Sequence, residues 1–512
     1  MWWNDLGKGS RETVVKIQGG LVGLLNIKPR LDIIEALIPF WDPTRNVFRF
    51  SDFELTPTLE EMAGYAGLNG NLRGRYPLAP RPVTLHRFLD LLSDSRDIQD
   101  KNLSEGYCTL HFLYHRCGNP QGFEEPNTGL THAGNKDKWE ARRGLAFMVA
   151  FLGVVICPRK DGHIDIGLVG ILDVAIKKSN STVVPLIVAE IYRALTMCRE
   201  GEKFFQGCNL LLQLWIQEHL CHRTGYMNYG LTGLSCIEEF KTRVTGIEFL
   251  EGTEAWLSCL RSLTADKIEW AFGWLPVAEA VYTSAEVPYI LLMGIRSIQP
   301  YAPHRVLRQL GRFQTVHNDE DLSKQIIELG PKDAFPEGKI RKIWNECRFL
   351  EPKTIVRDRA RGEVDPKYMI WFGKRFQISE RPAKRPHVQQ FTDGTQVQWD
   401  WLAKDKEYRA RIGKLEQQVQ DLQFEKSVQA ATDGGDKKKL TQENEVLKAQ
   451  IRQMKIAAKN QERSRYDERL INGLKKQVLE CQEELEKSEG NIAKIRAQWA
   501  KKQRRGPNLC SR

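Results

Sequence analysis

The chain has 512 residues, 41% of them hydrophobic, with 13 tryptophans and 21 phenylalanines. This composition supports a folded core and excludes disorder over the whole length. The formal net charge of +11 is unevenly distributed. Lysine plus arginine number 26 against 17 acidic residues in 401–512, nine against six in 357–400, and 41 against 42 in 1–356. Long-range attraction to nucleic acid is therefore expected only from the C-terminal part.

No apolar segment follows a basic one near Met1, so we expect no secretory signal. The strongest apolar run, 145–157, is shorter than the roughly 20 residues needed to cross a bilayer, and it predicts a buried helix or strand. We therefore expect an intracellular protein. In that setting the 11 cysteines should be reduced thiols, and the glycosylation sequon at Asn180 should stay unmodified.

The first 70 residues contain several local signals. The apolar spacing of 31–37 predicts a helix. Residues 41–50 predict a turn that leads into a short strand rich in β-prone side chains. Thr58 and Glu61 have the spacing of a capping box, in which each side chain accepts from the backbone amide of the other residue. Gly67 is placed to end the helix that this box starts.

Between residue 137 and about 295 the pattern is helical, with long apolar stretches at 139–157, 183–199 and 204–220. The predicted fold class is therefore mainly α: a helical globular region over 1–350 with minor β structure near the N-terminus. Residues 351–400 are predicted to be an irregular basic linker.

Residues 401–505 predict an interrupted coiled coil, because apolar residues recur at alternating spacings of three and four. The glycines of 433–436 interrupt it, since glycine is unfavourable in a helix by about 1 kcal/mol. Asn444 falls on a core position, where paired amides favour two parallel strands in register. Residues 506–512 are predicted to be a disordered tail. The predicted seam consists of Tyr408, Ile412, Leu415, Val419, Leu422, Leu440, Asn444, Leu447, Ile451, Met454, Ile471, Leu474, Val478, Cys481, Leu485, Ile492, Ile495 and Trp499.

The alternative interpretation of this region is a single long solvated helix. Four polar or small residues weaken the seam, namely Lys426, Ala458, Gln461 and Ser488. The partner predicted by the seam is a second copy or another coiled-coil protein.

Cys108, His111, His115 and Cys117 are all zinc-ligand types. Steps of three and four residues place the first three on one helical face, but the two-residue step turns Cys117 away by about 200°. The two cysteines would also lie about 13.5 Å apart along a straight helix. We therefore expect a buried helix face and no metal, while a site built on the two histidines with ligands from elsewhere stays open. His219, with its neighbours Cys221 and His222, is a weaker arrangement of the same type.

No phosphate-binding loop, serine-nucleophile elbow or metalloprotease motif occurs, so we expect no catalytic residue and no small-molecule substrate. Two basic clusters could contact phosphate or direct nuclear import, although solvated charge runs explain them equally well. They consist of Lys437, Lys438, Lys439, Lys501, Lys502, Arg504 and Arg505.

Two segments carry a family resemblance. Trp41-Asp-Pro-Thr44, continuing through Phe48 and Phe50 to the Leu55-Thr-Pro-Thr-Leu-Glu-Glu-Met62 segment, resembles the opening of the plant mobile domain. Pro303-His-Arg-Val-Leu-Arg-Gln-Leu-Gly311 resembles that domain's C-terminal segment. Residues 187–195 and 204–212 are similar to a nightshade-type branch of unknown function whose members also end in a coiled coil. Pro57 and Ala66 depart from the main pattern.

The resemblance implies a transposon-associated plant protein, with relatives linked to nuclear genome maintenance and silencing. It supplies no catalytic residues, and no lysine lies in a recognisable pyridoxal-phosphate context, so no cofactor is expected. The leading hypothesis is a non-enzymatic interaction protein, in the nucleus rather than the cytoplasm, that oligomerises through its coiled coil. The alternatives are weak, sequence-independent nucleic-acid binding by the basic tail, and a vestigial transposon enzyme.

Overall fold

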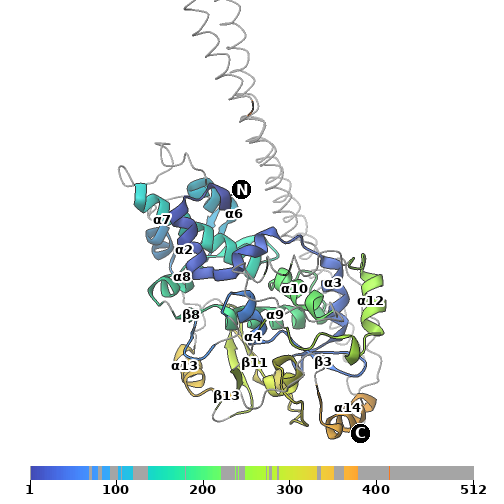
Figure 1. The fold of residues 1–512 in the computed structure, drawn as a ribbon. Helices are drawn as coiled ribbons and strands as arrows, with labels where there is room; N and C mark the ends of the chain where they lie inside the picture. The colour runs from blue at the N-terminus through green and yellow to red at the C-terminus, as the bar shows by residue number, and fades with distance from the viewer. Residues whose placement is uncertain are drawn as a thin grey trace, which may run out of the picture. The chain divides into compact units, whose positions relative to one another are not determined.

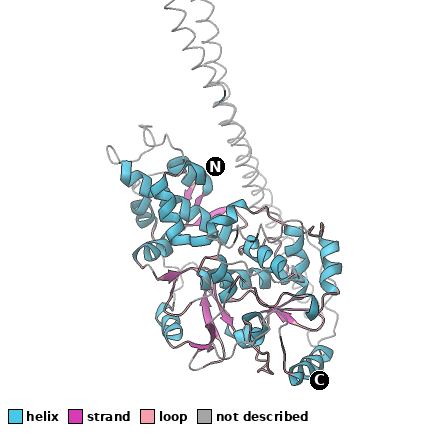
Figure 2. Cartoon of the chain, in the orientation of Figure 1, coloured by secondary structure: helices cyan, strands magenta, loops and turns pink. Residues whose placement is uncertain are grey.

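The computed structural model divides into two compact units, Met1–Trp399 and Asp400–Arg512 (Figure 1). Lys414 is the residue described in the second unit, so the predicted coiled coil lies outside the described residues. The first unit is mainly helical, as predicted, and it carries the predicted β structure near the N-terminus together with further small sheets later in the chain (Figure 2). The structure describes residues 2–68, 72–78, 83–92, 102–104, 106–118, 136–178, 180–220, 237, 240, 248–272, 274–275, 279–284, 287–330, 336–350, 363–378 and 414.

The helices vary from single turns to four turns. They are α1 (Trp2–Asp5), α2 (Lys8–Gln18), η1 (Gly19–Asn26), α3 (Leu31–Leu37), η2 (Ile38–Phe40), α4 (Leu59–Tyr65), α5 (Leu85–Leu92), α6 (Leu110–Leu113), η3 (Tyr114–Gly118), α7 (Lys136–Phe151), η5 (Leu152–Ile156), α8 (Leu168–Lys177), α9 (Val184–Arg199), α10 (Asn209–His219), α12 (Thr253–Arg261), η6 (Ala265–Lys267), η7 (Pro303–Leu310), η8 (Leu322–Gln325), α13 (Glu337–Asn345) and α14 (Pro366–Ile378).

Within the described residues the strands are short and form five small sheets, in the orders β1-β2-β3, β10-β11-β12, β13-β9, β4-β8 and β5-β6-β7. They are β1 (Trp41–Asp42), β2 (Val47–Arg49), β3 (Glu54–Leu55), β4 (Tyr76–Pro77), β5 (Leu103–Ser104), β6 (Tyr107–Thr109), β7 (His163–Asp165), β8 (Ser181–Thr182), β9 (Ala280–Thr283), β10 (Ile290–Met293), β11 (Ser297–Tyr301), β12 (Ile327–Glu328) and β13 (Arg348–Leu350).

The predicted turn and strand after residue 41 are confirmed. β1 and β2 form an antiparallel hairpin in which Asp42 lies opposite Val47. The Asp42 carboxylate accepts from the backbone N–H of Thr44 at 3.0 Å. Asn46 completes the turn with a φ of 53°, a conformation that asparagine adopts more readily than most residues. Its side-chain amide donates to the Pro300 carbonyl at 2.9 Å, so Asn46 is buried and attaches the turn to β11.

The predicted capping box is also confirmed. The Thr58 hydroxyl accepts from the Glu61 backbone N–H at 3.2 Å, and the Glu61 carboxylate accepts from the Thr58 N–H at 3.0 Å. At the other end of α4, Gly67 has a φ of 81°. The Gly67 N–H donates to the Gly64 carbonyl and the Leu68 N–H donates to the Ala63 carbonyl, which is the Schellman pattern that stops a helix.

The core is organised around α9 and α10. Both helices are buried on nearly every side, as expected for helices without a polar face. α9 packs against α4, β1, β10 and β11, and so lies between the first sheet and the later ones (Figure 1). The apolar run 145–157, predicted as a buried helix or strand, forms the end of α7 together with η5 and is buried.

The later sheets were not predicted. β9, β10 and β11 occupy residues for which the sequence indicated helix or gave no strand signal. β10 is a continuous four-residue apolar run that is buried throughout. Such a run lacks the alternation of a half-exposed strand, so its periodicity does not separate it from a buried helix. Its antiparallel partner β11 is likewise buried on both faces.

A close backbone approach joins α2 to the end of α4. The Gly20 N–H donates to the Ala66 carbonyl at 3.2 Å. Gly19 has a φ of 57°, and a Cβ at this position would lie 2.2 Å from the Ala66 carbonyl oxygen. Glycine is therefore required by both conformation and space.

We expect Gly19→Ala to lower the free energy of unfolding by at least about 2 kcal/mol, because it adds backbone strain to a clash with backbone. Gly9→Ala is the matched control, since Gly9 lies in α2 with nothing within 4 Å of an added Cβ. It should be neutral or stabilising by up to about 1 kcal/mol. Urea unfolding of the two variants checks this, and equal effects at the two positions would contradict the packing described.

Candidate functional site

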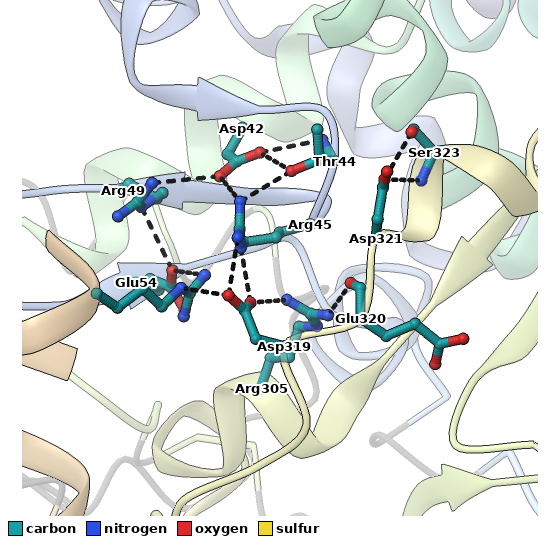
Figure 3. Close-up of polar contacts among 11 residues, drawn as sticks. Asp42, Thr44, Arg45, Arg49, Glu54, Arg305, Asp319, Glu320, Asp321 and Ser323 are labelled. Carbon is teal, nitrogen blue, oxygen red and sulfur yellow. Dashed lines mark hydrogen bonds and ion pairs between the residues drawn. The ribbon is translucent and has the colours of Figure 1, made fainter. Parts of the chain in front are cut away.

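Seven charged side chains from distant parts of the sequence gather beside the first sheet (Figure 3). We call this group the arginine cluster. It joins the β1-β2-β3 sheet to the segment that follows η7 and to α14. Its members are Asp42, Arg45, Arg49, Glu54, Arg305, Asp319 and Arg375.

The Arg45–Asp319 pair is the centre of the cluster. Arg45 donates through Nε and Nη2 to the two Asp319 carboxylate oxygens, each at 2.7 Å. This two-pronged geometry is the strongest arrangement for a guanidinium and a carboxylate. A further Arg45 nitrogen, Nη1, donates to Asp42 at 3.0 Å and to the Thr44 hydroxyl at 2.9 Å. The hairpin turn thus binds a residue 274 positions away in sequence.

The remaining contacts spread outward from this pair. Asp319 also meets Arg305 at 3.3 Å and Arg375 at 3.0 Å. Glu54 meets Arg375 at 2.9 Å and Arg49 at 3.6 Å. Every carboxylate of the cluster is therefore shared by at least two guanidinium groups.

The pKa values of Glu54 and Asp319 are shifted in opposite directions from their ordinary values. Burial raises the pKa of Glu54, and the nearby charges of Arg375 and Arg49 only partly offset this. Burial also acts on Asp319, but the Arg45 hydrogen bonds and the Arg375 charge outweigh it and hold its pKa at about 2. The difference follows from exposure: the Glu54 side chain is 0% exposed, whereas that of Asp319 is 27% exposed.

The cluster is poorly suited to metal binding or catalysis. Four guanidinium groups face three carboxylates, so its net charge is positive and opposes a cation. A metal would have to displace arginines from carboxylate oxygens that they already occupy. The seven members include no hydroxyl, thiol or imidazole nucleophile. The arrangement is therefore a clamp that holds the first sheet, the 305–320 segment and α14 together.

A second polar group, the Glu61 network, lies wholly in the core. The Glu61 carboxylate accepts from Trp215 Nε1 at 2.9 Å and from Gln309 Nε2 at 3.1 Å, and lies 3.1 Å from His219 Nε2. Gln309 also exchanges two hydrogen bonds with the backbone of Thr56, each 2.9 Å long. The network thus fixes α4, α10 and η7 against one another, and its many partners offset the cost of burying the charge.

Glu60, the neighbour of Glu61, is buried with fewer partners. Its carboxylate accepts from the Val281 N–H at 2.7 Å and from the Tyr301 hydroxyl at 3.2 Å. Burial raises the pKa of Glu60 from its ordinary 4.5 to about 7. The folded protein therefore holds a proton here, over a pH range in which the unfolded chain has released it.

The four metal candidates do not share one helix, so that expectation was wrong. Cys108 lies in β6 opposite Ile164 of β7, and α6 begins only after Thr109, whose hydroxyl accepts from the Phe112 N–H. His111 lies in α6, and His115 and Cys117 lie in η3. The side chain of His115 is outside the described residues. Cys108 and Cys117 are buried, and burial raises the pKa of the Cys108 thiol, which disfavours the thiolate that a metal requires.

Among the side chains that the structure describes, no group of three or more histidine, cysteine, aspartate or glutamate residues is placed to hold a metal ion. His219, weighed above as a weak metal candidate, contacts Glu61 and the Glu269 carbonyl in the core. The predicted seam from Tyr408 to Trp499 lies outside the described residues, as do the basic clusters from Lys437 to Arg505.

The sequence analysis missed both polar groups, because their members lie far apart in sequence, up to 253 positions within the Glu61 network and at least 321 within the arginine cluster. One signal existed. Asp42 and Arg45 lie in or next to the first segment of the family resemblance, and Arg305 and Gln309 lie in the second. The structure places these two segments in direct contact through Gln309, which bonds to Glu61 and Thr56. In the arginine cluster Asp319 bridges them, because it contacts both Arg45 and Arg305.

Replacing Glu60 with glutamine should make stability less dependent on pH. The folded-state pKa is raised, so the wild type is expected to lose stability as the pH rises from about 4.5 to 7, and glutamine removes that loss. The gain of Glu60→Gln over wild type should grow by roughly 3 kcal/mol across this range. Urea unfolding at several pH values measures it. Glu12→Gln, on the exposed face of α2, is the control, and a Glu60→Gln effect that is constant with pH would refute the assignment.

None of the helices in the described part of the chain is long and apolar enough to cross a membrane. No curated protein and no solved structure matches the chain. A family model described as Domain of unknown function (DUF7745) matches residues 3–377, which include the arginine cluster, the Glu61 network and all but the last residue of α14. Since the match covers well over half of the sequence, the chain belongs to this family.

Proposed function

We propose that this protein is a non-enzymatic interaction protein that oligomerises through residues 401–505 and presents its folded unit as a binding surface. The proposal rests on the positions of the large apolar side chains that are exposed to solvent. Eight large apolar side chains are exposed in the described residues. Four of them, Phe313, Val316, Met369 and Ile370, lie on two segments that are hydrogen-bonded to each other.

The polar groups of the fold support the same conclusion. In the arginine cluster and the Glu61 network, charged side chains are directed at one another within the fold and are largely buried. Catalytic groups, by contrast, must be placed where a substrate can reach them. In this fold the charged groups stabilise the interior, while apolar side chains are exposed. Exposed apolar side chains that lie together are typical of a surface that binds another protein.

The family resemblance supports a place among transposon-related plant proteins of the nucleus, with a role in genome maintenance or silencing. A second candidate function is weak, sequence-independent binding of nucleic acid. It is favoured by the 26 basic residues against 17 acidic residues in 401–512. The near-neutral charge of residues 1–356 argues against a folded nucleic-acid reader, which concentrates basic residues on one face.

The purified full-length protein is expected to be a dimer at micromolar concentration, as measured by sedimentation equilibrium. Leu447→Lys places a charge on the predicted seam and should weaken the dimer by at least about tenfold. Ala449→Lys is the matched control, because Ala449 falls on the outer side of the same heptad. A monomeric wild type at high micromolar concentration would refute the proposal, as would equal effects of the two variants.

A further inference from the structure

The exposed side of α14, its outer face, carries two apolar residues, Met369 and Ile370, which have no partner among the described residues, and two exposed lysines, Lys367 and Lys374, beside them. Tyr368 and Phe372 are buried against the fold. Met369 and Ile370 are exposed, and Ile370, at 61%, is the most exposed large apolar side chain that the structure describes. Tyr368 and Phe372, four residues apart, form the buried side of the helix. Ile370 shares its exposed side with Lys367 and Lys374, so this side combines apolar contact area with positive charge.

Phe313 and Val316 are also exposed, on a segment whose backbone is hydrogen-bonded to the residues that precede α14. Between them, Gln314 donates its backbone N–H to the Glu363 carbonyl and accepts from the Asp365 N–H at 2.8 Å. The side chains of Phe313 and Val316 are 41% and 44% exposed. The exposed apolar side chains therefore lie on two backbone segments that are fixed to each other.

Gly373 makes a notch in the outer face. It lies one turn after Met369 and Ile370 and is exposed, and nothing described lies within 4 Å of the Cβ position. Its φ is not positive, so neither conformation nor a neighbouring atom of the monomer requires glycine here. Glycine is among the least favourable residues inside a helix, so this position lowers the helix's own stability in the monomer. A notch beside two exposed apolar side chains allows close approach by a second helix.

The arginine cluster fixes this face in place. Arg375, which follows Gly373 and Lys374 on α14, contacts Glu54 at 2.9 Å and Asp319 at 3.0 Å. Tyr368 and Trp371 pack against His317 with ring-centroid distances of 6.2 and 4.7 Å. The outer face is therefore held rigid before any partner arrives, which lowers the entropic cost of binding.

The position of α14 in the chain indicates that a second copy of the protein covers its exposed side. About 30 residues separate Ile378 from the first predicted seam residue, Tyr408, and they span at most about 100 Å. A parallel, in-register coiled coil would tether two copies of α14 within this reach. The effective concentration of each for the other is then on the order of millimolar, so even a weak contact is populated. Two identical surfaces that meet in this way form a symmetric contact.

We propose that the outer face of α14, with Phe313 and Val316, is a second self-association surface that packs on the same face of another copy. This inference rests on the proposed dimer, because the tether supplies the local concentration. It adds that the folded units, and not only the predicted coiled coil, contact each other in the assembly.

The test uses the full-length protein with the photo-crosslinker p-benzoylphenylalanine in place of Ile370. We expect a crosslink between chains. The control carries the crosslinker in place of Val15, which is likewise an exposed apolar residue, in α2, and is tethered in the same way. Little crosslinking between chains is expected there. Equal yields at the two positions would overturn the inference, since tethering alone would explain them.

A second measurement separates this inference from the proposed function. Ile370→Asp should weaken the full-length dimer by at least about tenfold in sedimentation equilibrium, whereas Val15→Asp should leave it unchanged. Circular dichroism confirms that both variants are folded. A wild-type dimer unaffected by Ile370→Asp would overturn the α14 contact and leave the coiled-coil dimer standing. A monomeric wild type would overturn both.

Discussion

The fold depends on one interaction between distant parts of the sequence, the paired hydrogen bonds from Arg45 to Asp319. Arg45 lies in the turn of the first hairpin, and Asp319 lies in the segment that follows η7. Their contact aligns Asp42 and Glu54 on one side with Arg305 and Arg375 on the other. The first sheet, η7 and α14 share this contact, so each is held in place by the others.

The energetics of such a cluster are a balance of large opposing terms. Removing seven charged groups from water is costly, and their mutual attraction repays it only when geometry and hydrogen bonding are good. The paired hydrogen bonds of Arg45 and Asp319 meet that condition. The contacts of Arg375 with Glu54 and Asp319 are ion pairs in which buried Arg375 nitrogens make no hydrogen bond to any described residue. A cluster of this kind contributes chiefly to choosing one arrangement of the chain, because alternative packings would leave buried charges unpaired. The Glu61 network does the same deeper in the core, between α4, α10 and η7.

Local features of the fold could be predicted because their causes are local. The Thr58–Glu61 capping box, the Gly67 stop and the hairpin turn after Trp41 each depend on residues only a few positions apart, and all three are confirmed. Prediction failed where the cause is tertiary. β10 is an apolar run whose strand character comes from pairing with β11. Cys108 looked helical by spacing, yet it belongs to a strand because β7, far along the chain, pairs with it.

The arginine cluster could not be predicted either, because its cause is also tertiary. The spacing of Asp42, Arg45 and Glu54 does not indicate contacts with arginines at positions 305 and 375, since ion pairs between distant segments produce no periodic sequence pattern. The prediction of an irregular linker over 351–400 was wrong for α14, because residues 366–378 form a helix whose Tyr368 and Phe372 are buried against distant parts of the chain.

A double-mutant cycle on Arg45 and Asp319 tests this account most directly. The unfolding free energies of wild type, Arg45→Gln, Asp319→Asn and the double variant give the coupling between the two side chains. The account predicts a coupling of about 2 kcal/mol, because each single change leaves charged or polar groups without their partner. The same cycle on the exposed Lys8–Glu12 pair sets the baseline, at less than about 0.5 kcal/mol. A coupling at Arg45 and Asp319 no larger than that baseline would contradict the claim that this pair holds the fold together.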